Sequence, residues 1–186
     1  MNNPEEFEEL VQQAKSGNEN AFSHLYEYYL TPIFRFVYFR VRSQEDAEDL
    51  TQHVFLKAWS ALPEFQEEGR SFSAWLYRIA RNSTIDYWRK RKDIPLDPTS
   101  KTLHNKESKT ENPARLAEKG DTARMIREAL HILNEDQQTI IELKFIEELS
   151  NKEVAAVTGK SEGAIRQVQC RALKILRSHF QENNLS

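Results

Sequence analysis

The sequence predicts an all-α protein made of two small helical domains joined by a flexible linker. The chain has only 5 glycines in 186 residues, and its apolar residues do not alternate with the period of two that is typical of strands. Signals that start and stop helices recur along its length, beginning with Asn3, Pro4 and the acids that follow them. We expect the domains to cover residues 1–92 and 113–186, with the linker at residues 93–112.

The first domain is predicted to contain a series of helices with clear boundaries. Gly17 ends the first of them, and Pro32 is expected to kink or restart the helix that begins near Asn20. Ser43 opens a further helix that runs to Pro63, because an acid stands three residues after this serine, as in a capping box.

The polar face of the helix after Ser43 carries Asp46, Asp49, Gln52, His53 and Lys57, with Phe55 and Trp59 at its edges. The opposite face, which carries Ala47, Leu50, Val54 and Ala58, is expected to lie on the core. A solvated surface is the simplest interpretation of the polar face. Large apolar groups beside acids are also typical of a docking surface for a protein partner. Asp49 and His53 stand one turn apart, but no third ligand is evident nearby, so we predict no metal site.

The helix predicted from Phe72 to Lys92, capped by Ser71, is the segment around which the chain is organised, because its apolar residues do not fit on one face. One of its faces is typical of a helix on a core and consists of Phe72, Trp75, Leu76, Ile79, Ala80 and Tyr87. Asp86 projects to the same side, where we expect it to be a structural anchor that accepts hydrogen bonds or pairs with an arginine.

The other face of this helix mixes rings with cations and consists of Tyr77, Arg78, Arg81, Ile85, Trp88 and Arg89. Rings offer unpaired bases a surface for stacking, while arginine and lysine neutralise the phosphates alongside. A water-exposed face of this kind therefore suggests nucleic acid as its ligand. A solvated basic face whose rings lie over a neighbouring helix is the alternative, and this segment alone does not decide between them.

The second domain ends in a predicted helix-turn-helix. Ser150 opens a short helix with a capping box, Gly159 supplies the left-handed residue of a tight turn, and Ser161 caps a long final helix. On that helix one face is apolar (Ile165, Val168, Ala172, Ile175, Leu176) and the other is mainly polar (Arg166, Gln167, Cys170, Lys174, Arg177). Arginine reads guanine edges and glutamine reads adenine edges in a major groove, so the pattern indicates duplex DNA. A plain helical hairpin is the alternative.

Composition narrows the class of protein further. The formal net charge is −3, so we expect DNA binding to be local, assisted by a larger partner, or both. The single cysteine, Cys170, excludes an internal disulfide, and we find no signal peptide or membrane span. We therefore expect a cytoplasmic protein. We also predict that the protein is not an enzyme and needs no cofactor, because the sequence lacks a phosphate-cradling glycine loop and paired cysteines.

Four segments together resemble the extracytoplasmic-function (ECF) group of the sigma-70 family, the promoter-specificity factors of bacterial RNA polymerase. They are NAFSHLYEYY, DAEDLTQHVFLKAW, FSAWLYRIARNSTIDYWRKR and the terminal helix-turn-helix with its Arg171-Ala172 pair. The resemblance implies a sigma-2-like domain at residues 1–92 and a sigma-4-like domain at residues 113–186. It also implies that the linker threads the active-site and RNA-exit channels of the polymerase.

The resemblance assigns a role to each surface. The polymerase-binding residues, which would dock on the beta-prime clamp helices, are Asp46, Asp49, Leu50, Gln52, His53 and Phe55, although relatives usually have an acid in place of His53. The residues that would bind and open the minus-ten element are Tyr77, Arg78, Arg81, Asn82, Trp88 and Arg89. The residues that would read the minus-thirty-five element are Ser161, Glu162, Arg166, Gln167, Arg171 and Lys174. The sigma-4-like domain would also meet the polymerase beta flap, and an anti-sigma factor is a possible partner.

Two other classes of protein remain open at this point. An enzyme of nucleic-acid metabolism could use the helix-turn-helix for targeting, although the chain has no H-E-x-x-H motif. A transcriptional regulator could act as a dimer without polymerase, in which case the N-terminal helices would form the dimer interface. For the sigma-factor interpretation, we expect the outer faces of both DNA-binding helices, including Arg81 and Trp88, to lie outside the protein interior.

Overall fold

The computed structural model describes residues 4–41, 43–66, 71–93 and 125–183, and within these residues all regular structure is helical. This confirms the all-α prediction. The predicted linker, apart from Asp93, lies outside the described residues, as does the start of the second predicted domain. The N-terminal half contains α1 (Pro4–Lys15), α2 (Glu19–Tyr38), α3 (Gln44–Ala61), the 3-10 turn η1 (Leu62–Glu64) and α4 (Phe72–Asp93).

Helix α2 runs without a break through Pro32, so the predicted restart at this residue is wrong. Asn18 caps the helix, and its side chain accepts a hydrogen bond from the Ala21 amide at 3.2 Å. Proline removes one backbone donor. Ile33, Phe36 and Val37 follow it, however, and are fully buried, so packing of this face holds the helix together past the missing bond.

Helices α3 and α4 pack on α2 to form the first bundle. Ser43 caps α3 as predicted and accepts a hydrogen bond from the Asp46 amide at 3.2 Å. After η1, the rings of Phe65 and Trp75 meet at 4.9 Å and join the start of α4 to this bundle.

The C-terminal half comprises helical residues 125–131 and four named elements. These are α6 (Glu135–Ile141), the π-helical turn η2 (Glu142–Ile146), α7 (Asn151–Thr158) and α8 (Glu162–Asn183). Complete capping boxes at Asn134 and Ser150 start α6 and α7. Gly159 ends α7 with φ 73°, the left-handed conformation that the turn requires.

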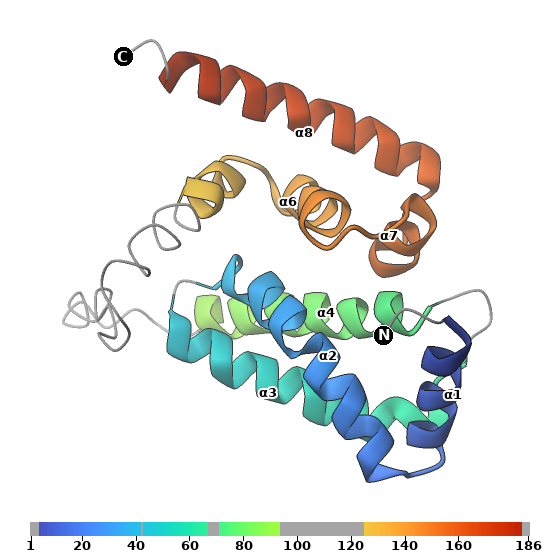
Figure 1. Ribbon diagram of the computed structural model, residues 1–186. Helices are drawn as coiled ribbons and strands as arrows, with labels where there is room; N and C mark the ends of the chain where they lie inside the picture. The colour runs from blue at the N-terminus through green and yellow to red at the C-terminus, as the bar shows by residue number, and fades with distance from the viewer. Residues whose placement is uncertain (1–3, 42, 67–70, 94–124, 184–186) are drawn as a thin grey trace, which may run out of the picture.

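The two halves of the chain pack against each other. Helix α4 lies between α2 and α3 on one side and the α6–α7 segment on the other (Figure 1). Ile140, Leu143 and Val154 belong to the same cluster of buried side chains as Phe36 and Leu76 of the first bundle. A smaller cluster joins Phe39 to the C-terminal half through Leu130, Leu133, Ile141 and Ala172. The sequence predicted the two helical halves but not this shared core.

Two side chains lie on the opposite side from the one we expected. Asp86 does not face the core, because its side chain is 41% exposed and pairs with Arg89 at 3.0 Å, one turn along α4. Ile175, expected on the buried face of α8, is 39% exposed, whereas its neighbour Leu176 packs against the smaller cluster. Within the described residues, no helix is both long and apolar enough to cross a membrane.

A core substitution should show whether the halves unfold together. Ile140 is completely buried in the shared cluster, so Ile140→Ala should lower the free energy of unfolding by about 2–5 kcal/mol. We expect one urea transition for both proteins, followed by tryptophan fluorescence from the N-terminal half and by far-UV circular dichroism. Ile132→Ala, at a position 39% exposed, is the control and should change the midpoint little. Two separated transitions in the wild-type chain would contradict the shared core.

Candidate functional site

The outer face of α8 is open to solvent. Ser161 caps the helix by accepting a hydrogen bond from the Ala164 amide at 3.2 Å, and the fully buried Ile165 and Ala172 fix its inner face. The six residues predicted to read duplex DNA are all exposed: Ser161, Glu162, Arg166, Gln167, Arg171 and Lys174. This leaves the N-terminal turns of α8 free to enter a major groove.

The face of α4 predicted to bind unpaired DNA is only partly open. Arg78, Asn82 and Arg89 are exposed. Tyr77, by contrast, is 2% exposed, and Arg81 and Trp88 are half-buried. The expectation that this whole face meets water is therefore wrong for half of the set, because Tyr77 meets Glu147, Arg81 meets Glu135 and Asp136, and Trp88 meets the Arg40 carbonyl.

Glu147 is the centre of the contact that covers Tyr77. Its carboxylate is 2% exposed and accepts three hydrogen bonds, from the Tyr77 hydroxyl at 2.7 Å and from Arg35 Nη2 and Nε at 2.7 and 2.9 Å. Burial and the adjacent carboxylate raise the pKa of Tyr77, and the hydrogen bond to Glu147 raises the pKa of Arg35. Both donors therefore keep their protons at neutral pH, and Glu147 links α2 to α4 through a charge-assisted network.

Arg40 is the centre of a second buried contact, which reaches α4 at Trp88. Arg40 forms an ion pair with Glu142 beneath the surface, its guanidinium lies 3.6 Å from the centre of the Phe36 ring, and its backbone carbonyl accepts a hydrogen bond from Trp88 Nε1 at 3.0 Å. The indole of Trp88 is thus held by its nitrogen against the first bundle. Its role in the structure is partly to anchor α4, in addition to any contact with nucleic acid.

Arg81 is largely covered, but its neighbours do not satisfy all of its hydrogen-bond donors. Its side chain is 19% exposed, and Nη2 lies 3.7 Å from Glu135 and 4.0 Å from Asp136, which are distances of ion pairs rather than of good hydrogen bonds. Its Nε is buried and has no hydrogen-bond partner among the described residues. A buried donor without an acceptor is unfavourable, so the covered state leaves this cation incompletely satisfied.

Glu153 joins the start of α4 to the start of α7. One of its oxygens caps α7 by accepting hydrogen bonds from the Ser150 amide and hydroxyl at 2.9 and 2.8 Å. The other accepts hydrogen bonds from the hydroxyls of Ser71 and Ser73 at 2.8 and 3.0 Å. Burial opposes ionisation of this carboxyl, but the four hydrogen bonds outweigh burial and lower its pKa.

The surface of α3 predicted to dock on a protein is partly exposed and partly used within the fold. Asp49, Gln52 and His53 are exposed, whereas Leu50 is half-buried. Phe55 is 5% exposed, with its ring edge-on to that of Tyr26 at 4.6 Å.

Asp46, also predicted for the docking surface, is half-buried and is hydrogen-bonded within the fold. Its carboxylate accepts hydrogen bonds from the Tyr87 hydroxyl at 2.8 Å and from Arg91 at 3.0 Å. These bonds tie α3 to the C-terminal part of α4, so the structure uses Asp46 as an internal contact rather than as a free acid.

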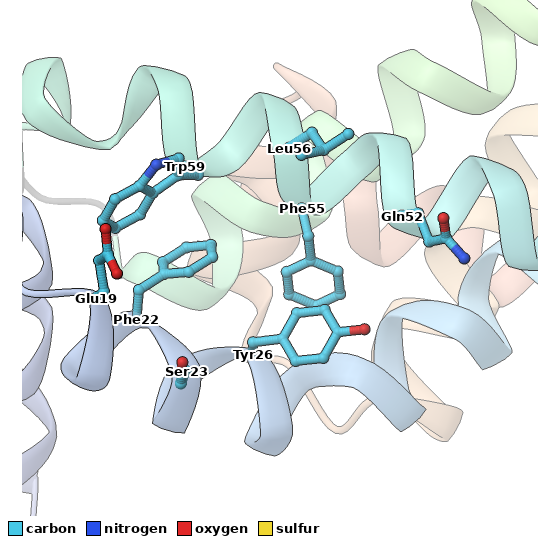
Figure 2. A pocket seen from close by; sticks show the side chains of 8 residues that line it. All are labelled: Glu19, Phe22, Ser23, Tyr26, Gln52, Phe55, Leu56 and Trp59. Carbon is cyan, nitrogen blue, oxygen red and sulfur yellow. The ribbon is translucent and has the colours of Figure 1, made fainter.

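Beside these residues, α2 and α3 enclose an open groove of about 500 Å³. Figure 2 shows the rings of Phe22, Tyr26, Phe55 and Trp59 facing one another along it. Leu56, which our sequence interpretation missed, stands on its rim with 66% of its surface exposed. Polar groups at its edge are Glu19, Ser23 and Gln52. An apolar floor with a polar rim is typical of a site that receives apolar side chains from a protein partner.

The pKa of Glu153 predicts how the contact between α4 and α7 responds to acid. A carboxyl whose pKa is lower in the folded state stabilises that state above its ordinary value of 4.5, and the contribution is lost as pH falls through the lowered pKa. Glu153→Gln should therefore be less stable than wild type near pH 6, and the difference should shrink below about pH 4.5. Urea unfolding at several pH values measures it. A constant difference at all pH values would contradict this assignment.

Comparison with known proteins identifies the two halves separately. Residues 25–94 match the family description Sigma-70 region 2, and residues 129–178 match Sigma-70, region 4. The first segment contains α3 and α4, and the second contains α6, α7 and most of α8. The matched segments therefore include the α3 surface, the α4 face and the outer face of α8.

Several characterised proteins are similar over most of the chain. The ECF RNA polymerase sigma factor BldN of Streptomyces coelicolor is 36% identical over 168 residues, which are 90% of this chain and 63% of BldN. The ECF RNA polymerase sigma factor SigD of Mycobacterium tuberculosis is 33% identical over 180 residues, 95% of this chain and 84% of SigD. Among solved structures, CnrH in complex with the cytosolic domain of CnrY is 27% identical, with a TM-score of 0.72 over 93% of this chain and 96% of that chain.

Proposed function

Since this chain belongs to the ECF group of the sigma-70 family of RNA polymerase sigma factors, we propose how its surfaces divide the work of transcription initiation. The sigma-2-like half, residues 1–92, binds core polymerase and the minus-ten element. The sigma-4-like half, residues 113–186, binds the minus-thirty-five element, and residues 93–112 connect them. The chain acts as an initiation factor in the cytoplasm and not as an enzyme.

The observation that carries this proposal is the contrast between the outer faces of α4 and α8. The α8 face presents the exposed Arg166 and Gln167 on a capped helix, which suits base edges in an intact major groove. The α4 face presents Arg78, Asn82 and Arg89 beside the half-buried ring of Trp88, which suits bases and phosphates of a separated strand. The chain therefore carries one face suited to duplex promoter DNA and another suited to separated strands.

The groove between α2 and α3 is the proposed docking site for the beta-prime clamp helices. Exposed Asp49, Gln52 and His53 form its polar side, and Leu56 with the aromatic floor forms its apolar side. A helix that lays apolar side chains into a groove with a polar rim is a common mode of protein recognition. The same chain would also meet the beta flap through its sigma-4-like half. CnrH was solved with the cytosolic domain of CnrY, and an anti-sigma partner is proposed here by analogy.

Substitutions on α8 should alter which upstream promoter sequence is used. Arg166→Ala or Gln167→Ala removes a side chain that can pair with a base edge, and each loss should reduce discrimination at one base pair by about 1–3 kcal/mol. Run-off transcription with core polymerase on a randomised promoter library measures the preference. Arg177→Ala, an exposed cation further along the same helix, is the control and should weaken binding evenly. An unchanged preference in both variants would count against α8 as the reader.

Truncation of Leu56 should weaken the docking on core polymerase. Its side chain is largely exposed, so Leu56→Ala should leave the fold intact while it reduces co-purification with core polymerase several-fold. Asp49→Ala should act in the same direction. Leu173→Ala removes a similarly exposed leucine from α8 and is the matched control. Full retention of polymerase by both α3 variants would refute this docking site.

A further inference from the structure

One end of the groove between α2 and α3 combines a carboxylate with aromatic rings. Glu19, Phe22 and Ser23 line this end from the N-terminal turns of α2, and Trp59 lines it from α3 (Figure 2). The three α2 residues precede residue 25, where the segment that matches Sigma-70 region 2 begins. The family match therefore assigns no role to this end of the groove.

Glu19 is the only charged side chain among the residues that line the groove. It is exposed, and among the residues that the structure describes it has no ion pair or side-chain hydrogen bond. Lys57, the cation of α3 nearest to Trp59 in sequence, donates a hydrogen bond to Ser83 of α4 at 3.5 Å and does not line the groove. The groove thus carries one unpaired negative charge, which a positively charged group of a partner would complement.

Two aromatic rings lie at the same end of the groove as this carboxylate. Phe22 follows Glu19 by about one turn of α2, and its ring centroid lies 4.7 Å from that of Trp59, with an angle of 54° between the ring planes. Both side chains are half-buried, so part of each ring remains accessible. A cation is attracted to the face of an aromatic ring, and the attraction is strongest for tryptophan. The carboxylate and the rings can therefore act on one cation together.

We propose that Glu19, Phe22 and Trp59 form a binding site for an arginine side chain of the beta-prime clamp helices, which we call the cation subsite. Arginine fits this site better than lysine, because a planar guanidinium can stack on a ring while it donates two parallel hydrogen bonds to a carboxylate. The inference rests on the proposed function, because it takes the groove to be the docking site for core polymerase.

The cation subsite gives the groove a direction. Leu56 and the paired rings of Tyr26 and Phe55 offer contacts to apolar side chains, but such contacts do not distinguish the two orientations of a docked helix. Gln52, also on the lining, is polar but uncharged. Because only the end at Glu19 carries a charge, an arginine bound there determines which way the partner helix lies along the groove.

The first experiment measures the affinity of the full chain for core polymerase at several salt concentrations. Glu19→Gln keeps the shape of the side chain and removes its charge. The dissociation constant should therefore rise about threefold to fivefold at low salt, and the difference from wild type should shrink as salt is added. Glu27→Gln makes the same change at another exposed position of α2 that does not line the groove, and should leave the affinity unchanged. A loss of the same size at every salt concentration would overturn the proposal, because salt does not screen a change in packing.

A double-mutant cycle tests whether the carboxylate and the indole bind the same cation. Trp59→Phe retains a ring that can pack on Phe22 and weakens the attraction for a cation. If both side chains bind one arginine, the affinity lost by the double variant should be smaller than the product of the two single losses. Circular dichroism checks that each variant keeps its helical content. Losses that multiply in full would contradict a shared site.

A small probe tests the preference for arginine without polymerase. N-acetylarginine amide, added to the isotope-labelled full chain, should shift the nuclear magnetic resonance signal of the Trp59 Nε1–H group, which Trp59→Phe identifies by its disappearance. N-acetyllysine amide at the same ionic strength should shift this signal less, and neither probe should shift it in Glu19→Gln. Equal shifts by the two probes, or no shift by either in the wild-type chain, would refute the cation subsite.

The variants on α3 separate this proposal from the proposed function. If Leu56→Ala reduces co-purification with core polymerase while Glu19→Gln binds it normally at every salt concentration, the docking site stands and the cation subsite is refuted. If Leu56→Ala, Asp49→Ala and Glu19→Gln all retain the polymerase fully, the docking site itself is refuted and the cation subsite with it. The expected result is a loss in all three variants.

Discussion

Helix α4 packs on the first bundle on one side and on α7 on another, and the rest of the structure depends on this double packing. Phe72, Leu76 and Ala80 are buried within the fold, while Ser71, Ser73 and Tyr77 reach across to α7 and to the residues before it. A helix packed on two sides cannot present its full circumference to a ligand. The arrangement therefore joins the stability of the chain to the accessibility of the basic aromatic face of α4.

The contact between the halves combines an apolar cluster with buried carboxylates. Ile140, Leu143 and Val154 bring apolar surface to the first bundle, and the burial of such side chains supplies the main favourable term. Hydrogen bonds depend on geometry, so those that Glu147 and Glu153 accept from the N-terminal half fix the relative position of the helices. Apolar burial without this polar pattern would leave the angle between the halves less well defined.

The two faces proposed to bind DNA differ in how much of each is buried by the fold. On α8, Ile165 and Ala172 are buried and the polar face is exposed, as expected of an amphipathic helix. On α4, both faces carry large side chains, and the fold packs most of one and half of the other. Four positions on α4 differ from expectation, because Tyr77, Arg81 and Trp88 are covered and Asp86 is not. Tyr77, opposite the first bundle, meets Glu147 of the C-terminal half, whereas Asp86, expected to face the core, is 41% exposed.

The sequence by itself determined the helices, their caps and the exposed face of α8, because these follow from local signals. Ser43, Asn134, Ser150 and Gly159 all stand where the capping rules place them. Tertiary structure alone decided which cations of α4 are covered, that Asp46 is an internal tie, and that Leu56 stands on the rim of a groove. The physical reason is the separation along the sequence of the residues that interact. A cap involves residues three apart, whereas Arg35 and Glu147 are separated by 112 positions, and no periodicity in the chain encodes that they meet.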